Sequence, residues 1–200
     1  LTLVARRREL LEKLSAELGV PAQAIEWDLC DPTRAAAWIP EAEAKLGPID
    51  VLVNNAGVQI IGSILDIGEE EADRLLRLDL LAPMRITRAV LPSMLARKSG
   101  AIIDIASVAG IAPTPYMNYY NAAKAGLAAF SESLRGELRG TGVSVLTVYP
   151  GPVDTPMSRE GFAVYPKSFL TRLTPEGSPE VLARAIRRAL ERRRSRVIYP

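Results

Sequence analysis

A chain of 200 residues is long enough to bury one sizeable core, and 48% apolar with 24% charged residues is the balance of an ordinary globular protein. The net charge of +2 gives no reason to expect nucleic acid or a membrane surface as partner, and no apolar run reaches the roughly 18 residues of a membrane span. A single cysteine, Cys30, excludes an internal disulfide framework and fits a reducing, cytoplasmic compartment.

Strands and helices alternate along the whole sequence. In chain order, apolar runs, helical leucine spacing and capping residues predict strand 1–5, helix 6–18, strand 24–29, helix 31–47, strand 49–57, helix 69–96, strand 100–107, helix 116–140, strand 143–151, an irregular stretch 152–177, helix 178–194 and strand 196–200. Asp31 is the expected cap of helix 31–47 and Pro40 its interruption, whereas Pro83 and Pro92 are expected to bend the long helix. This alternation predicts one α/β domain over residues 1–200, with a parallel sheet and helices on both faces.

Polar and turn-forming residues gather where three consecutive predicted strands end. Asn54–Gly57 follows one strand, Ser107 the next, and Pro150–Thr155 the one after that. Because sheets of this kind bind ligands at the carboxyl ends of their strands, these segments predict one common site. The sequence contains no histidine, which excludes a Ser-His-Asp triad and histidine-based metal sites. No metal is therefore expected, and any chemistry must use Tyr, Lys, Ser, Asp or Glu.

Four motifs together carry a resemblance to a known family. They are "NNAG" at 54–57, Ser107 in "DIASVAG", Tyr120 and Lys124 as Y-x-x-x-K, and "PGPVDT" at 150–155. Each alone is common, but their order and spacing resemble those of the short-chain dehydrogenases/reductases over essentially the whole chain. The resemblance implies a Rossmann-like doubly wound fold and a hydride-transferring oxidoreductase that interconverts a carbonyl (ketone or aldehyde) and an alcohol.

The resemblance also assigns catalytic roles. Tyr120 would be the general acid or base, Lys124 would lower its pKa and hold the nicotinamide ribose, and Ser107 would orient the substrate oxygen. One helical turn separates Tyr120 from Lys124, so both can reach one site. Tyr119 has Ala123 at the corresponding position and is expected to pack toward a neighbouring helix or subunit.

A cofactor site is implied by the same resemblance. Its expected residues are Asn54 bound to backbone near the cofactor, Ala56 and Gly57 beside the adenosine ribose, Asp28 and Leu29 at the adenine, and Pro150, Gly151, Val153 and Thr155 at the nicotinamide end. By the resemblance, strand 1–5 corresponds to the second strand of the family. NAD-selective folds place an acidic residue at the end of that strand, but here Ala5 is followed by Arg6 and Arg7. Arginine can bind a 2′-phosphate, so NADP(H) is the preferred cofactor, with NAD(H) also possible.

Two features depart from the family pattern. Asp79 stands where the family usually has an asparagine that holds a water in the proton relay to the lysine; altered relay duty and inactivity both remain open. The first strand and its Gly-rich pyrophosphate loop are missing, and the first strand would lie between strands 1–5 and 49–57. The chain is therefore expected to be N-terminally incomplete, with roughly 30–40 further residues before Leu1.

The irregular stretch is expected to cover a small-molecule carbonyl or alcohol substrate. Residues 156–175 correspond to the family's variable substrate lid, and Phe162, Tyr165 and Phe169 suggest an apolar pocket.

The long helices 69–96 and 116–139 predict a homodimer or homotetramer. The basic helix end Arg187–Arg196 is either a solvated terminus or an anion or membrane patch. The alternatives are a non-catalytic cofactor-sensing or protein-binding module of the same fold and, less compatible with the length, a sugar-nucleotide epimerase or dehydratase.

Overall fold

The computed structural model describes residues 1–31, 33–164 and 175–200. Within them the chain runs in the order β1 (Thr2–Ala5), α1 (Arg8–Glu17), β2 (Gln23–Glu26), α2 (Ile39–Leu46), β3 (Val51–Asn54), α3 (Glu69–Leu76), the π-helix η1 (Arg77–Leu81), α4 (Ala82–Arg97), β4 (Gly100–Ile105), the 3-10 helix η2 (Val108–Gly110), α5 (Asn118–Glu137), β5 (Val143–Pro150), α6 (Pro156–Val164), α8 (Pro179–Glu191) and β6 (Arg196–Tyr199). None of the helices in these ranges is long and apolar enough to cross a membrane.

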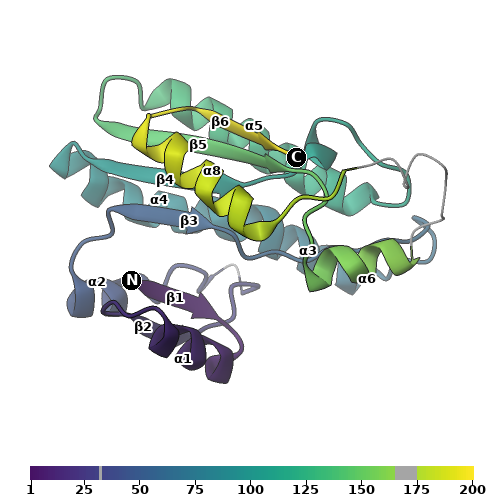
Figure 1. The fold of residues 1–200 in the computed structure, drawn as a ribbon, viewed down its shortest axis with the longest axis horizontal. Helices are drawn as coiled ribbons and strands as arrows, with labels where there is room; N and C mark the ends of the chain where they lie inside the picture. Colours follow the sequence, from purple (N-terminus) through teal and green to yellow (C-terminus); the bar gives the residue numbers. More distant parts are fainter. Residues whose placement is uncertain (32, 165–174) are drawn as a thin grey trace.

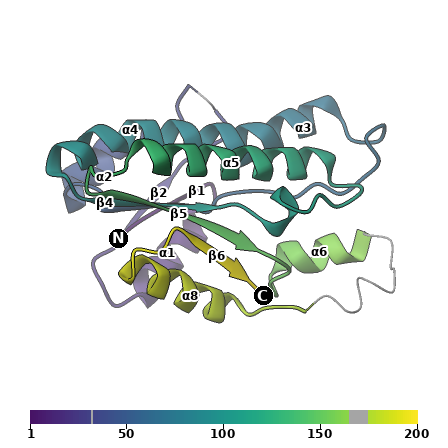
Figure 2. The same ribbon diagram turned by 90° about the horizontal axis from the view of Figure 1, so that it is seen from above.

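A parallel sheet of order β3-β4-β5-β6 forms the centre of the fold. Helices α4 and α5 cover one face and α8 covers the other (Figures 1 and 2). The two central strands, β4 and β5, are mostly apolar and buried along most of their length, as expected where helices cover both faces. The predicted α/β fold with a parallel sheet and helices on both faces is confirmed.

Strands β1 and β2 form a separate parallel pair. Figure 1 shows this pair below β3, and no ladder of hydrogen bonds joins β1 to β3 within the part of the chain that the structure describes. Val51 and Val53 on β3 are 44% and 51% exposed, unusual for an apolar strand. The open edge lies where the sequence predicted a further strand.

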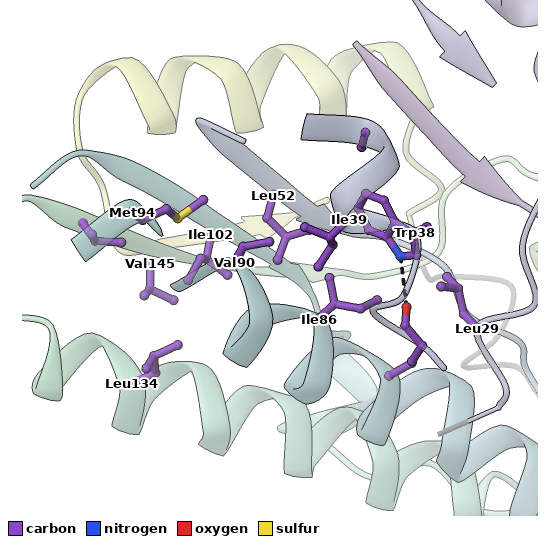
Figure 3. Packing of buried hydrophobic residues seen from close by; sticks show 14 of the residues in the cluster. Leu29, Trp38, Ile39, Leu52, Ile86, Val90, Met94, Ile102, Leu134 and Val145 are labelled. Atoms are coloured by element: carbon purple, nitrogen blue, oxygen red, sulfur yellow. Dashed lines mark hydrogen bonds between the residues drawn. The ribbon is translucent and has the colours of Figure 1, made fainter. Parts of the chain in front are cut away.

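The largest apolar cluster lies between the central sheet and the helices α2, α4 and α5. Leu52, Ile102 and Val145 project from three adjacent strands toward Val90 and Met94 of α4 (Figure 3). Each such side chain stabilises the fold by about 1.5–3 kcal/mol when fully buried. Trp38 lies in the same cluster, and its Nε1 donates to the carbonyl of Ala35 at 2.9 Å, so the indole is buried without an unpaired donor.

One predicted helix begins later in the structure than the sequence indicated. The helix expected over 31–47 begins only at Ile39, and Pro40 lies in its first turn instead of interrupting it. Proline is tolerated there because the first helical N–H groups need no partner. Asp31 accepts hydrogen bonds from the N–H and hydroxyl of Thr33, at 2.8 and 2.6 Å, so it caps a turn.

The long helix 69–96 contains a wider turn that the sequence did not predict. In η1 the N–H of Ala82 donates to the carbonyl of Arg77, a π-helical spacing. Pro83 follows directly; it has no N–H for the carbonyl of Asp79, and its ring would crowd that carbonyl in a regular helix. The wider turn relieves this crowding and sets the direction of Asp79.

The stretch 152–177 was predicted as irregular, which is wrong for its first part. Helix α6 covers Pro156–Val164, and the hydroxyl of Thr155 accepts the N–H of Ser158 at 3.2 Å. A capping threonine followed by proline is a helix start signal. The whole stretch was predicted as irregular because its prolines were taken as loop residues, although Pro156 lies in the first turn of α6.

Candidate active site

Ser107 and Lys124 meet at the carboxyl end of β4. Ser107 caps η2: its Oγ accepts the N–H of Ala109 at 3.1 Å and donates to the carbonyl of Pro150 at 3.4 Å. Lys124 of α5 sends its Nζ to the carbonyl of Ile105, 3.0 Å away, just before Ser107. The two predicted residues are therefore attached to the same strand end.

Tyr120 precedes Lys124 by one turn of α5. The Lys124 Nζ lies 5.7 Å from the centroid of the Tyr120 ring, close enough for the ammonium to act on it electrostatically. Tyr119 and Tyr120 both pack beside the cluster of Ile60, Leu75 and Ala123. Leu75 belongs to α3 and Ala123 to α5, so this cluster lies between two helices, and the packing of Tyr119 toward a neighbouring helix or subunit stays a prediction.

Asp79 forms a buried ion pair with Lys124. Its Oδ2 lies 3.1 Å from Nζ, and the two side chains are 0% and 6% exposed. The Oδ1 accepts the N–H of Val58 at 2.8 Å, which fixes the carboxylate from the other side. Burial raises the pKa of Asp79, and the charge of Lys124 opposes that rise. The pairing that the sequence allowed is present, and the lysine is held between a strand carbonyl and a carboxylate.

Gly57 has a second reason to be glycine. A Cβ at this position would stand 2.7 Å from the Oδ2 of Asp79, so a side chain here would displace the carboxylate. The family resemblance implied only that Gly57 lets a ribose approach. The contact with Asp79 could not be found in the sequence because it depends on how η1 packs over the turn after β3.

Asn54 has other partners than the predicted ones. Its Nδ2 donates to Asp104 Oδ1 at 2.7 Å and to Thr87 Oγ1 at 3.1 Å, all three residues being buried. The amide hydrogens of Asn54 therefore join β3 to β4 and α4, a role that was not expected, and its binding to backbone near the cofactor stays a prediction. The sequence analysis also missed Asp104, although an acid inside the apolar strand "GAIIDI" was a visible signal.

Asp28 and Leu29, the residues expected at the adenine, have partners within the protein. Asp28 uses Oδ1 to accept the N–H of Cys30 at 2.9 Å, which is a local turn. Leu29 is 8% exposed and belongs to the main apolar cluster, so its side chain fills the core.

Arg6 and Arg7 follow β1 and lie exposed at the start of α1. Neither forms an ion pair with any other described residue, whereas the neighbouring Arg8 is paired with Glu12 at 2.7 Å. The two guanidinium groups are therefore free to bind an anion near the end of β1.

The segment Pro150–Thr155 is fastened to β6 and α6. The N–H of Gly151 donates to the carbonyl of Tyr199 at 2.6 Å, and Val153 is buried and forms a parallel bridge with Gly177. Thr155 caps α6 with its hydroxyl, a role beyond the predicted one. These contacts hold the segment in place beside Ser107, whose hydroxyl reaches Pro150.

Helix α6 begins the predicted lid and lies against the segment that follows the turn 54–57. A Cβ on Gly161 would stand 2.7 Å from Gln59 Oε1 and 3.2 Å from Ile61 Cδ1. The other lid predictions, Tyr165, Phe169 and the side chain of Phe162, lie outside the described residues.

Comparison with known proteins agrees with this geometry. The family described as short chain dehydrogenase matches residues 1–164, and the chain belongs to this family. It is 37% identical to the ketoacyl reductase HetN of Nostoc sp. over 90% of this chain and 61% of HetN, and 37% identical to the oxidoreductase UcpA of Escherichia coli over 82% of this chain and 65% of UcpA. The chain thus spans less than two thirds of the length of these two relatives.

Solved structures show the same fold. A short-chain dehydrogenase from Sphingobium yanoikuyae in complex with NADPH superposes with a TM-score of 0.86 at 31% identity, covering 98% of this chain and 76% of that chain. One from Streptomyces avermitilis superposes with a TM-score of 0.84 at 33% identity, covering 100% of this chain and 78% of that chain. The Rossmann-like arrangement is therefore shared with enzymes of this family.

Proposed function

We propose that the protein is an NAD(P)(H)-dependent oxidoreductase that interconverts a small carbonyl compound and its alcohol. The observation that carries this proposal is the position of Lys124, held between the Ile105 carbonyl and Asp79 with its ammonium 5.7 Å from the Tyr120 ring. A surface lysine paired by chance with a tyrosine would not be buried and fixed in this way.

The residues present fit a dinucleotide. The arginines after β1 are unpaired within the described part of the chain, and Lys124 uses its ammonium hydrogens on only two protein oxygens there, which leaves a third hydrogen for a ribose hydroxyl. Arg6 and Arg7 would hold a 2′-phosphate, and Lys124 and Tyr120 would hold the nicotinamide ribose. When bound, the nicotinamide supplies or takes the hydride.

The side chains then handle the substrate oxygen and its proton. In the reduction direction Tyr120 donates its phenolic proton to the carbonyl oxygen, and the ammonium of Lys124 stabilises the phenolate that remains. Ser107 donates a hydrogen bond to the same oxygen. Its present bond to the Pro150 carbonyl is long, at 3.4 Å, so the hydroxyl can turn to a substrate at little cost. Asp79 keeps the ammonium in position.

The preference for NADP(H) over NAD(H) is part of the proposal. What supports it is the pair of exposed arginines next to Ala5, where NAD-selective folds carry an acid. A 2′-phosphate needs cationic donors, and Arg6 and Arg7 offer them without first breaking an ion pair.

We also propose a cytoplasmic homodimer or homotetramer formed through α4 and α5. An apolar hollow of about 350 Å³ lies on the face of these helices, lined by Leu81, Met84, Arg85, Thr87, Arg88, Leu91, Phe130 and Leu134. Hollows of this character are typical of surfaces that another chain covers.

Turnover of a panel of ketones and aldehydes with NADPH tests the activity, with Tyr120→Phe as the decisive variant and Tyr119→Phe as its matched control. Loss of general acid–base catalysis costs about 10²–10⁴-fold in kcat, so Tyr120→Phe should be nearly inactive and Tyr119→Phe close to the parent. Equal activity of Tyr120→Phe and the parent protein would overturn the mechanism.

A non-catalytic, cofactor-sensing role is the second candidate. The observation that favours it is the buried carboxylate of Asp79, which offsets the charge that Lys124 directs at Tyr120. Tight NADPH binding, measured by calorimetry, with no turnover of any carbonyl would favour this role over the first.

A further inference from the structure

Asp104 is a buried acid in the middle of β4. It is 0% exposed, and its neighbours in register are Asn54 on β3 and Thr147 on β5, both uncharged. No lysine or arginine among the described residues lies within ion-pair distance of it. A carboxylate in such a place would be a buried charge without a counter-ion, which is costly.

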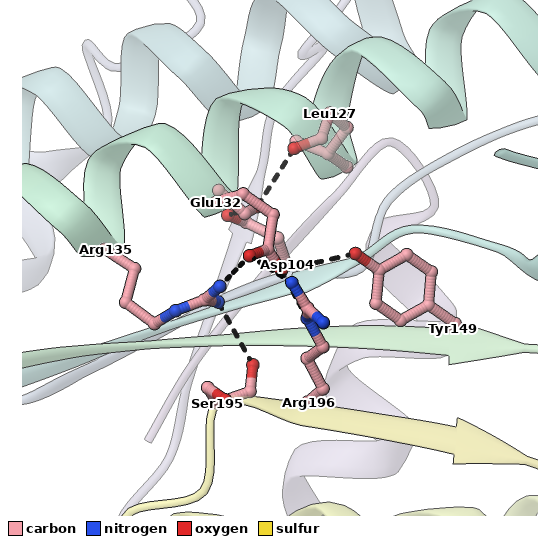
Figure 4. A network of polar contacts seen from close by, with 8 residues as sticks. Asp104, Leu127, Glu132, Arg135, Tyr149, Ser195 and Arg196 are labelled. Carbon is pink, nitrogen blue, oxygen red and sulfur yellow. Dashed lines mark hydrogen bonds and ion pairs between the residues drawn. The ribbon is translucent and has the colours of Figure 1, made fainter. Parts of the chain in front are cut away.

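The hydrogen bonds around Asp104 can be counted. Its Oδ1 accepts from Asn54 at 2.7 Å, and its Oδ2 lies 2.5 Å from the hydroxyl of Ser131, which also lies 2.9 Å from the carbonyl of Leu127 (Figure 4). Ser131 has one hydroxyl hydrogen but faces two acceptors if Asp104 is ionised. A proton on Oδ2 resolves the count: Asp104 donates to Ser131, and Ser131 donates to Leu127.

Electrostatic effects also favour the protonated form of Asp104. Burial raises the pKa of Asp104, and the hydrogen bonds of Ser131 and Asn54 and the charge of Lys124 oppose that rise only in part. The other groups that face Asp104 from the neighbouring elements are neutral. Lys124 is the titratable group whose charge acts on Asp104, and its ammonium is already paired with Asp79 at 3.1 Å. The ammonium of Lys124 is therefore the counter-ion of Asp79, and Asp104 has none of its own.

We propose that Asp104 is a neutral carboxylic acid that donates its proton to Ser131 and thereby positions α5 on β4. Helix α5 is joined to this strand at two points about two turns apart, by Lys124 on the Ile105 carbonyl and by Ser131 on Asp104. Together these contacts fix the height and the rotation of the helix that carries Tyr120. The consequence for catalysis rests on the proposed function, but the protonation of Asp104 does not.

The protonation state is tested directly by infrared spectroscopy of the purified protein with ¹³C-labelled aspartate at neutral pH. The parent protein is expected to show the carbonyl stretch of a buried protonated acid. This band should disappear in Asp104→Asn and persist in Asp79→Asn, the matched control for the other buried acid. A difference spectrum in which Asp104→Asn removes only carboxylate bands overturns the proposal.

Stability against pH provides a second test with a defined sign. An unfolded aspartate loses its proton near pH ~4, whereas folded Asp104 keeps it, so the folded state binds more protons above that pH. Stability of the parent protein should therefore fall relative to Asp104→Asn as pH rises from about 4 through the folded pKa of Asp104, and then level off. The opposite slope, a parent protein that gains stability relative to Asp104→Asn over this range, overturns the proposal.

Positioning is tested by kinetics. The side-chain amide introduced by Asp104→Asn can still donate to Ser131, so this variant should keep kcat within about threefold, whereas Ser131→Ala breaks the attachment and should lower kcat by up to about 100-fold with little change in KM. Ser133→Ala, on an exposed position of α5, is the control and should match the parent. Parent-like kcat in Ser131→Ala overturns the positioning role. If the parent itself shows no turnover, the proposed function fails while the infrared result still decides the state of Asp104.

Discussion

Gly57 and Asp79 are in contact at the centre of the site: a Cβ on Gly57 would stand 2.7 Å from the carboxylate oxygen that faces Lys124. The glycine of the turn after β3 therefore does more than make room for a ligand. The absence of a side chain at Gly57 leaves space for Asp79 of η1 to reach Lys124 of α5. A methyl group at this position would therefore disturb the contact between two other segments of the chain.

Gly57→Ala should lower both the activity of the enzyme and the stability of the fold. The methyl group must push the Asp79 carboxylate away from Lys124, which loosens the buried ion pair and costs about 1–3 kcal/mol of stability, as overpacking in a tight interior usually does. Activity should fall by at least about tenfold because Lys124 is then held only by the carbonyl of Ile105. Gly136→Ala is the matched control: a Cβ there meets nothing within 4 Å, and in a helix it should stabilise by about 0.5–1 kcal/mol. Urea unfolding and steady-state kinetics on both variants measure the difference, and a Gly57→Ala protein as active as Gly136→Ala contradicts the role of the contact.

Asp79→Asn should keep activity and move its pH dependence. The amide retains an oxygen for the Val58 N–H but removes a negative charge 3.1 Å from the Lys124 ammonium. The full charge of Lys124 then acts on Tyr120 and favours its phenolate, so the midpoint of the kcat/KM profile should move to lower pH.

Asp79→Ala is the companion variant for this prediction. It removes both the charge and the acceptor for Val58 and leaves the buried ammonium without a partner from η1, so it should lose most of the activity and about 3–5 kcal/mol of stability. A pH profile of Asp79→Asn that coincides with that of the parent would show that the carboxylate has no electrostatic effect on the tyrosine.

The convergence of the site could be predicted, but the direction of individual side chains could not. The place of Ser107 follows from a strand end and the pairing of Tyr120 with Lys124 from helical spacing, whereas the resemblance to the family implied that the three share one site. Asn54 also ends a strand, yet its side chain turns inward to Asp104. In a strand that is apolar on both faces the alternation of polar and apolar residues is absent, so the pattern gives no information on which face a given residue occupies.

The remaining differences between the predicted and the observed structure depend on packing between segments that are far apart in the sequence. The π-helical turn that carries Asp79 lies directly before Pro83, whose ring would crowd the Asp79 carbonyl in a regular helix, whereas the sequence predicted only a bend at this proline. The burial of Leu29 could not be predicted for a similar reason. Its strand ends at Glu26, and the chain then folds back into the core, which no local pattern in the sequence indicates.

Replacing Ala5 by Asp and Arg6 by Gln should invert the cofactor preference. The new carboxylate would repel a 2′-phosphate and accept a hydrogen bond from a 2′-hydroxyl, while the loss of Arg6 removes a cationic donor. Since Arg6 has no ion pair with another described residue, its removal should leave stability within about 0.5 kcal/mol of the parent. The ratio of kcat/KM for NADPH and NADH is the measurement, and Arg8→Gln, which breaks only the exposed pair with Glu12, is the control. Unchanged NADPH selectivity in the double variant contradicts the assignment.

Glu132 should be the most important surface carboxylate for holding β6 on α5. It accepts two hydrogen bonds from the guanidinium of Arg196, at 2.8 and 2.7 Å, is paired with Arg135, and accepts the Tyr149 hydroxyl at 3.4 Å (Figure 4). Bidentate pairing and a shared network make this contact stronger than an isolated surface ion pair. A double-mutant cycle on Glu132 and Arg196, read by urea unfolding, should give a coupling energy of about 1 kcal/mol that decreases at high salt.

The control for this cycle is the exposed pair of Arg187 and Glu191 on α8, whose charged atoms are 3.3 Å apart. It should give a coupling energy of about 0.3–0.5 kcal/mol. Equal coupling energies for the two pairs would show that β6 is held by apolar packing against α8 and not by Glu132.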